Sequence, residues 1–99
     1  MKLNTAVIEL KEIAAKLNLV LSVKYQREKA KEELCELLIE LIKVDTKDRS
    51  NKTQIVNEIV DVWITTIQLA HLYGIDECEE RLAFKLSKLK ELASDFYHC

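Results

Sequence analysis

The chain has 99 residues, of which 48% are hydrophobic, and its 15 basic and 17 acidic side chains give a formal net charge of -2. This length fits one small domain, residues 1–99, rather than two. Acidic and basic residues are interleaved instead of forming blocks, which argues against a nucleic-acid-binding surface. The apolar stretches are too short and too often interrupted by charges for a membrane span or a signal peptide. We therefore expect a cytoplasmic protein with neither nucleic acid nor membrane as a partner.

The composition predicts an all-α fold. There is no proline and one glycine, and helix-forming residues such as Leu, Glu, Lys and Ala are prominent. The three cysteines, Cys35, Cys78 and Cys99, are odd in number and lack a CxxC pattern, so we expect reduced thiols. A domain of ~100 residues buries a smaller fraction of its surface than a larger one does. We therefore expect an oligomer.

A first helix is expected to have Asn4 or Thr5 as its N-cap and to end at Leu17 or Leu19. Residues 18–23 lose the polar face of a helix, which predicts a bend or a break. Apolar side chains in this segment need cover from neighbouring helices or from a second subunit.

A second helix is expected to begin between residues 22 and 25 and to end at about Lys43. Tyr25 and Gln26 lie at its start, where a role in beginning the helix is favoured over a nucleotide pocket. Its apolar arc contains Ala30, Leu34, Leu37, Leu38 and Leu41. Three acids, Glu33, Glu36 and Glu40, border that arc instead of lying opposite to it.

The polar residues 44–52 predict a loop, and Asn51 followed by Gln54 resembles a capping box for a third helix over residues 53–73. Apolar side chains cover more than half of this helix, which predicts the buried centre of a bundle, with Trp63 in the core. Its narrow polar strip contains Glu58, Asp61, Thr65 and Gln68. Unpaired acids on a buried helix cost several kcal/mol. These two acids therefore predict a functional site.

A fourth helix is predicted over residues 77–96. Gly74 fits a left-handed C-terminal cap of the preceding helix, and Asp76 with Glu79 fits a capping box for this one. Its inward positions are expected to be Leu82, Leu86, Leu89 and Phe96, and its middle carries Lys85, Lys88 and Lys90.

Two acid pairs share one spacing. Residues at i and i+3 lie on one face of a helix, so Glu33 and Glu36 form one pair of neighbours and Glu58 and Asp61 form another. Four carboxylates inside an apolar bundle repel each other and resist desolvation unless cations neutralise them. The pattern therefore predicts a site for a hard divalent cation, Mg²⁺ in the first place.

These residues carry a resemblance to a known family. An ExxE string, roughly twenty residues and an ExxD string before an apolar helix resemble the MazG-like all-alpha nucleoside triphosphate pyrophosphohydrolases. Here the strings read EELCE, Glu32–Glu36, and NEIVDVW, Asn57–Trp63, and the resemblance covers residues 26–88. Each string alone is common by chance, whereas both at this separation are specific.

The resemblance implies a four-to-five-helix MazG-like bundle that is completed by oligomerisation as a homodimer or a dimer of dimers. It implies that Mg²⁺, or Mn²⁺ in its place, is held by Glu33, Glu36, Glu58 and Asp61. It implies hydrolysis of a (deoxy)nucleoside triphosphate to the monophosphate and pyrophosphate, in housecleaning of the nucleotide pool. One of the four acids, or a neighbouring one, would then help to deprotonate the attacking water.

The family's lysine motif KxxK(N) is similar to Lys85–Lys88, but Leu89 stands where the asparagine would be. A phosphate contact by Lys85 and Lys88 is the weaker expectation, equal in weight to a solvated lysine face. Ile39 stands where relatives often have a third acid, which leaves Glu40 or Glu32 to replace it.

Other functions remain open. A non-catalytic helical interaction module of the same fold would use the acids for a structural ion or a basic partner, and related chemistry on phosphoribosyl-ATP or a modified nucleotide is a third hypothesis. A non-functional interpretation is that the four acids form ordinary ion pairs on the surface. His71 and His98 have no partner at ligand spacing, which argues against a histidine metal site. Cys35 lies between acids, which disfavours a catalytic thiolate.

Overall fold

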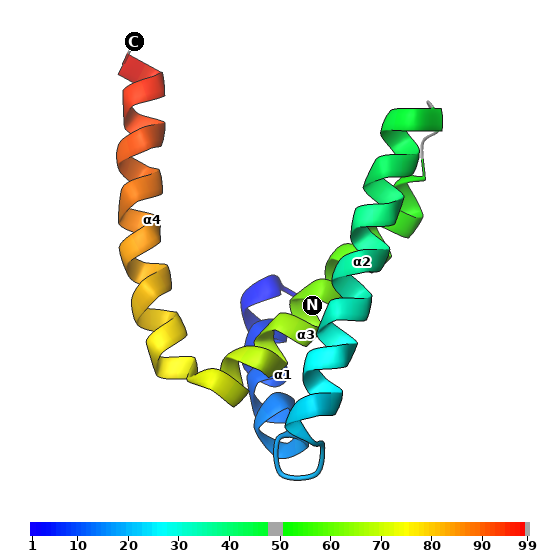
Figure 1. Cartoon of the computed structure of the whole chain (residues 1–99). Helices are drawn as coiled ribbons and strands as arrows, with labels where there is room; N and C mark the ends of the chain where they lie inside the picture. Colours follow the sequence, from blue (N-terminus) through cyan, green and yellow to red (C-terminus); the bar gives the residue numbers. More distant parts are fainter. Residues whose placement is uncertain (48–50, 99) are drawn as a thin grey trace.

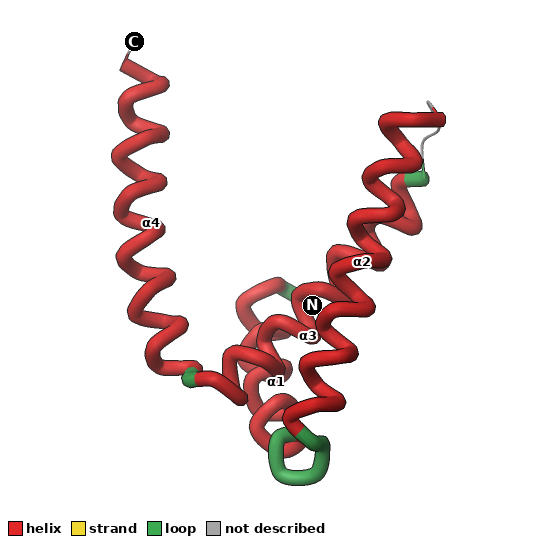
Figure 2. The backbone as a smooth tube through the Cα atoms, viewed as in Figure 1, coloured by secondary structure: helices red, strands yellow, loops and turns green. Residues whose placement is uncertain are grey.

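A computed structural model describes residues 1–47 and 51–98, and every regular element in these ranges is a helix (Figures 1 and 2). The helices are α1 (Leu3–Leu17), α2 (Val23–Lys47), α3 (Lys52–Tyr73) and α4 (Ile75–His98). The predicted all-α fold with four helices is thus confirmed. None of the four, over the described residues, has the length and hydropathy needed to cross a membrane.

Helix α3 is the common neighbour in this arrangement. It packs along α2, along α1 and, near its C-terminal end, against α4, and no other pair of helices packs together in the described part of the chain. Figure 1 shows α4 running away from the α2–α3 hairpin. The radius of gyration is 16.4 Å, whereas a closed domain of this length has ~13 Å. The chain by itself is therefore an open arrangement of helices.

The interior of the single chain is small and mostly polar. Its buried hydrophobic residues are Ala14 and Ala30, and its buried polar residues are Gln26, Glu33, Glu58 and Thr65. Helix α3 is central, as predicted, but its apolar face is not buried, and Trp63 is 48% exposed. The prediction that Trp63 lies in the core is therefore wrong for the single chain. The polar strip of α3 faces α2, and α1 also packs along α3, but the wider apolar face is only partly covered, with Val56 47% and Trp63 48% exposed.

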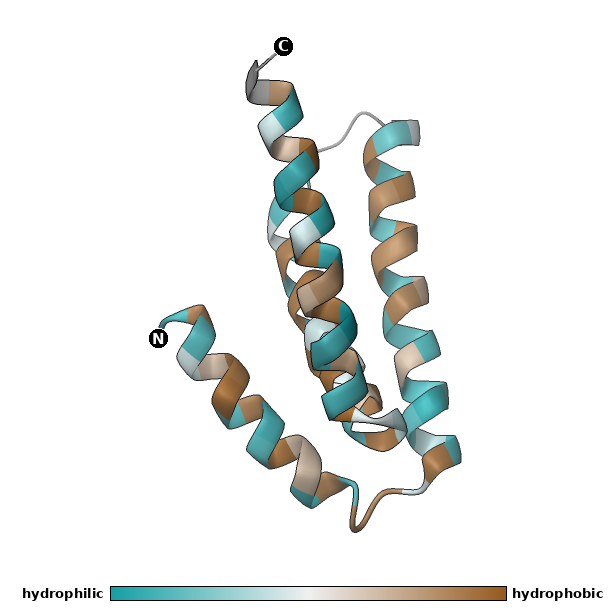
Figure 3. Cartoon of the chain, turned by 90° about the vertical axis from the view of Figure 1, so that its left-hand side faces the viewer, coloured by the Kyte–Doolittle hydropathy of each residue, from teal (hydrophilic) through white to brown (hydrophobic). Residues whose placement is uncertain are grey.

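The inward face predicted for the fourth helix is also exposed. Leu82, Leu86, Leu89 and Phe96 are between 44% and 75% exposed. Figure 3 colours the hydrophobic residues brown along this helix. The physical reason is that, among the described residues, α4 packs against the end of α3 and meets α1 through the Lys11–Glu79 ion pair, so no helix packs along these side chains.

The predicted loop over residues 44–52 is too long at its N-terminal side. Helix α2 continues to Lys47, and the Thr46 hydroxyl donates to the Ile42 carbonyl at 2.9 Å. No glycine or proline interrupts this segment, so the helix has no reason to end at Lys43. Residues 48–50 of that predicted loop lie outside the described residues.

The cap predicted for the first helix is wrong, whereas the predicted start of the second helix between residues 22 and 25 is confirmed by Val23. Lys2, not Asn4 or Thr5, is the N-cap of α1, and the Asn4 side chain accepts from the Thr5 N–H at 2.9 Å within the first turn. At the start of α2, the Ser22 hydroxyl accepts from the Tyr25 N–H at 3.0 Å, which stabilises the helix start as a cap does.

The predicted capping box of α3 does not form. Asn51 occupies the N-cap position, but its side chain makes no cap hydrogen bond and its amide donates to Glu40. Gln54 donates to the Glu58 carboxylate at 2.6 Å instead of reaching back to Asn51. The amide of Gln54 thus stabilises an acid of α3 rather than the end of the helix.

Gly74 separates α3 from α4. Its N–H donates to the Ala70 carbonyl at 2.8 Å and its φ is 135°, a conformation that side-chain-bearing residues rarely adopt. Gly74 is therefore the C-cap of α3 with a positive φ, as expected, but its φ of 135° and ψ of 95° differ from the left-handed helical conformation. Asp76 lies inside the first turn of α4, which begins at Ile75, so the capping box expected for Asp76 and Glu79 is wrong.

Candidate metal centre and adjoining pocket

The seam between α2 and α3 brings the acid pairs together. Glu33, Glu58 and Asp61 each place one carboxylate oxygen within 4.8 Å of the others. A second group, Glu32, Glu33 and Glu36, meets the same limit, so Glu33 belongs to both. The spacing of i and i+3 places each pair on one face, and the packing of α2 along α3 makes the two faces meet.

Two of these acids are buried with an oxygen that has no partner. Glu33 is 7% exposed and Glu58 is 6% exposed. Among the residues that the structure describes, Oε2 of each carboxylate is buried without a hydrogen bond. Their other oxygens are engaged: Glu33 Oε1 lies 3.1 Å from the Lys29 ammonium, and Glu58 Oε1 accepts from Gln54 at 2.6 Å. Each buried carboxylate is thus held by one oxygen, while its other oxygen has no hydrogen bond within the described ranges.

The remaining two acids of the cluster titrate abnormally. Desolvation, followed by the negative charges of Glu33 and Glu58, raises the pKa of Glu36. The same causes in the same order raise the pKa of Asp61, and the Lys29 ammonium opposes them. The shifts show that Glu36 and Asp61 feel both buried carboxylates, so all four predicted acids belong to one electrostatic cluster.

The chemistry of the donor set fits a hard divalent cation. Every member of the two groups offers carboxylate oxygen, the donor that Mg²⁺ and Mn²⁺ prefer, and neither group contains a histidine or cysteine. Buried carboxylate oxygens without a partner are costly unless something pairs with them. A bound cation would pair with these oxygens and would also remove the repulsion between the carboxylates.

Glu40 and Glu32 were the two candidates for an additional acid. Glu40 accepts from Lys43 at 3.0 Å and from the Asn51 amide. These contacts engage Glu40 near the end of the hairpin where α2 connects to α3. Glu32 belongs to the group with Glu33 and Glu36, although it is exposed. Of the two, Glu32 is therefore the acid that the structure places beside the cluster.

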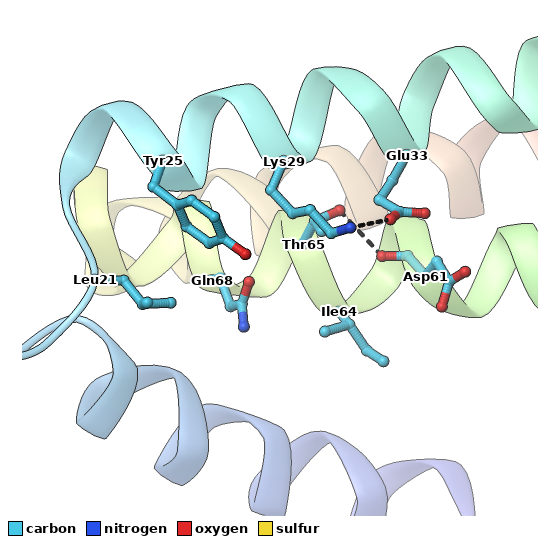
Figure 4. Close-up of a pocket in the computed structure, with 8 residues that line it drawn as sticks. All are labelled: Leu21, Tyr25, Lys29, Glu33, Asp61, Ile64, Thr65 and Gln68. Carbon is cyan, nitrogen blue, oxygen red and sulfur yellow. Dashed lines mark hydrogen bonds and ion pairs between the residues drawn. The ribbon is translucent and has the colours of Figure 1, made fainter.

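A pocket of about 200 Å³ adjoins the acids (Figure 4). Its lining residues are Leu21, Tyr25, Lys29, Glu33, Asp61, Ile64, Thr65 and Gln68. In Figure 4, Tyr25, Lys29 and Gln68 extend into the same space from α2 and α3. Tyr25 therefore lines a pocket as well as starting a helix.

The chain near residue 21 is fixed beside this pocket by a buried amide. Gln26 is 3% exposed, and its Nε2 donates to the Asn18 side chain at 3.0 Å and to the Leu21 carbonyl at 3.3 Å. The predicted break after the first helix is thus a turn held against the start of α2. This contact positions Leu21 at one end of the pocket.

Lys85 and Lys88 lie on α4, and neither lines the pocket. The Lys88 ammonium lies 5.5 Å from the centre of the Phe84 ring, and the Arg81 guanidinium lies 5.2 Å from the same ring. Both contacts are local to α4. Within the single chain the two lysines are therefore not brought to the acid cluster.

Lys29 is the pocket residue that the sequence did not single out. It lies four residues before Glu33, and that spacing is the usual one for a surface ion pair on a helix. The sequence did contain a signal for Lys29. Glu33 was already a candidate metal ligand, so a lysine four residues before it could have been examined as its contact.

No family model, no curated protein and no solved structure matches this chain. The spacing of the acid pairs is therefore the only link to the MazG-like proteins. What the site can do has to be argued from its carboxylates, its lysine and its pocket.

Proposed function

We propose that this chain is a Mg²⁺-dependent hydrolase of the MazG-like type, which converts a (deoxy)nucleoside triphosphate to the monophosphate and pyrophosphate. One observation carries the proposal: Glu33, Glu58 and Asp61 converge within 4.8 Å, and buried oxygens of the first two have no partner among the described residues. A triphosphate is strongly anionic and needs cations to approach carboxylates. An acidic cluster beside a pocket is therefore compatible with a triphosphate that binds together with Mg²⁺.

Glu33, Glu36, Glu58 and Asp61 would hold Mg²⁺, with Mn²⁺ as the substitute. When bound, the ion would neutralise phosphate charge and stabilise the leaving pyrophosphate. In the overall reaction, water adds to phosphorus, the bridging P–O bond between the α and β phosphates breaks, and pyrophosphate leaves. The proton of the water passes to a carboxylate. Glu36 and Asp61 suit that role because they are less buried than Glu33 and Glu58.

The partner that we propose is a second copy of this chain, in a homodimer or a dimer of dimers. The support is the apolar surface that the single chain leaves open on α3 and α4, which includes Trp63 and Leu86. Exposed apolar patches on a protein surface are typical of interaction sites. Assembly would also give Lys85 and Lys88 a route to the acids of the other copy.

The biological role that we propose is cytoplasmic housecleaning of nucleotide pools. It is supported by the resemblance of the acid pairs alone. The experiment is a substrate panel: each common ribonucleoside and deoxyribonucleoside triphosphate is incubated with the protein and Mg²⁺, and monophosphate and pyrophosphate are separated by chromatography. Turnover of at least one triphosphate, abolished by EDTA, is expected. Absence of turnover throughout the panel would overturn the catalytic proposal.

A non-catalytic helical interaction module is the second candidate, favoured by the exposed apolar faces of α3 and α4. In that case the acids would bind a structural ion or a basic partner. The two candidates differ in one measurement: with Mg²⁺ the enzyme releases pyrophosphate from at least one triphosphate, whereas the module releases it from none.

A further inference from the structure

Lys29 lies where the acid cluster meets the pocket. Its ammonium is 3.1 Å from Glu33 Oε1 and 3.8 Å from Glu32 Oε1, and its side chain lines the pocket (Figure 4). Among the eight lining residues it is the one cation. Asp61 lines the same pocket, so the positive charge lies beside two acids of the cluster.

We propose that Lys29 binds the phosphates of the substrate in this pocket and, through its other contact, holds the Glu33 carboxylate in place. This inference rests on the proposed function and adds a residue to it. A lysine ammonium has three N–H donors and no acceptor. The contact with Glu33 uses one donor, which leaves donors for an anion that enters the pocket.

The geometry makes both roles compatible. Lys29 engages Oε1 of Glu33, whereas Oε2 of the same carboxylate is buried and unbonded among the described residues. Glu33 can therefore offer Oε2 to a cation while Oε1 stays with the lysine. The oxygens of a phosphate would then be neutralised from two directions, by the cation on the carboxylates and by the ammonium in the pocket.

An ordinary surface ion pair would look different, and α2 contains one for comparison. Lys31 lies 2.9 Å from Glu28, and both side chains are more than half exposed, at 66% and 59%. The acid that Lys29 contacts has a side chain only 9% exposed. Lys31 lies on the same helix with the same charge, is absent from the pocket lining, and is therefore a matched control.

The experiment compares wild type with Lys29→Met, Lys29→Arg and Lys31→Met. Binding of Mn²⁺ alone is measured by electron paramagnetic resonance, and binding of inorganic pyrophosphate at saturating Mg²⁺ by isothermal titration calorimetry. For Lys29→Met we expect pyrophosphate to bind about tenfold more weakly or worse, the loss of one charge-assisted hydrogen bond. Its Mn²⁺ affinity should fall by less than its pyrophosphate affinity, because Lys29 positions Glu33 but is not itself a metal ligand. Lys29→Arg should lose less pyrophosphate affinity than Lys29→Met. Lys31→Met should match wild type in its affinity for both Mn²⁺ and pyrophosphate.

Several outcomes would overturn the inference. Wild-type pyrophosphate affinity in Lys29→Met would exclude a phosphate contact, and a loss of Mn²⁺ affinity equal to that of pyrophosphate would reduce Lys29 to a support for Glu33. In both cases the proposed function survives, because wild type still binds both probes. If wild type binds neither probe, the proposed function fails together with the inference. If Lys29→Met loses its helical circular dichroism, Lys29→Gln replaces it in the comparison.

Discussion

Glu33 of α2 and Glu58 of α3 meet across the helix seam, and each is anchored through Oε1 while its buried Oε2 has no partner among the described residues. The anchors are Lys29 and Gln54, one a cation and one a neutral amide. Two carboxylates in this relationship repel each other and are poorly hydrated. The seam is therefore stabilised by whatever positive charge enters it.

Removing charge from the α3 half of the cluster should abolish catalysis. Glu58→Gln and Asp61→Asn keep the size of each side chain but remove a negative oxygen donor. We expect pyrophosphate release to fall by about 100-fold or more, because loss even of a residue that only orients a metal ligand costs ~10–100-fold. The measurement is pyrophosphate release with a substrate from the panel, with circular dichroism to show that the helices remain.

Glu28→Gln is the control for this pair of variants. Glu28 is an exposed acid of α2 that contacts Lys31 rather than the cluster. Its activity should equal that of wild type. Full activity in either Glu58→Gln or Asp61→Asn would show that the site assignment is wrong.

The metal-free protein should lose stability as the pH rises above the usual pKa values of Glu36 and Asp61. Burial and the neighbouring carboxylates raise the pKa of Glu36 and Asp61 above the usual 4.5 and 3.8. The folded chain therefore binds protons more tightly than the unfolded chain, and the free energy of unfolding falls with rising pH from those usual values through the raised ones. Urea unfolding in EDTA, followed by circular dichroism at several pH values, measures this.

Other groups also titrate over this range, so the comparison is with Asp61→Asn. The unfolding free energy of Asp61→Asn minus that of wild type should grow as the pH rises above 3.8, the usual pKa of Asp61, because the amide does not ionise. Added Mg²⁺ should remove this difference by pairing with the carboxylates of wild type. A difference that stays constant with pH would contradict the raised pKa of Asp61.

The acid cluster was predictable because helical spacing determines which residues share a face. Glu33 with Glu36, and Glu58 with Asp61, needed only the two helices and their contact. Lys29 was not predictable in the same way, since a lysine four residues before a glutamate looks like any surface pair. Its importance comes from the burial of Glu33, which the packing of α2 on α3 determines.

The caps and the loop were harder to predict for a physical reason. The capping box of α3 failed because the Gln54 side chain donates to Glu58, one turn further along the same helix, rather than back to Asn51. The predicted loop began too early because polar residues such as Thr46 are tolerated in a helix when nothing breaks it. In both cases the polar side chain makes a hydrogen bond one turn away within its own helix instead of taking the predicted cap or loop role.

Self-association should depend on one face of α4. Its exposed apolar residues recur at alternating spacings of four and three, the pattern of a helix–helix seam: Leu82, Leu86, Leu89, Ala93 and Phe96. The double variant Leu86→Glu/Leu89→Glu places two acids on this apolar face of α4. We expect the dissociation constant of the oligomer to rise about 30-fold or more, as measured by sedimentation equilibrium.

Phe84→Glu makes the same kind of change on the opposite face of α4 and should leave a dimer intact. Trp63 gives an independent signal, because it is the single tryptophan and is half-exposed in one chain. Its fluorescence should shift to the red on dilution of wild type. A monomeric wild type at high concentration would contradict the proposed assembly.

Gly74→Ala should destabilise the junction between α3 and α4. The added methyl group would meet Glu77 at an ordinary contact distance of 3.4 Å, so the strain comes from the φ of 135°. We expect a cost of about 1 kcal/mol or more, which lowers the melting temperature by roughly 4–8 °C. Calorimetry measures the shift. Ser87→Ala, at an exposed position within α4, should change stability by less than about 0.5 kcal/mol, and an equal shift in both variants would contradict the argument.

The two faces of α3 impose different constraints on how its sequence can vary. The strip with Glu58 and Thr65 is enclosed by the chain itself, so a substitution there must be compatible with a fixed set of neighbours on α2. The face with Trp63 is open in one chain, so its side chains can change whenever the surface that covers them changes too. Among descendants of this sequence, the strip should therefore be invariant, whereas the open face should drift in concert with α4.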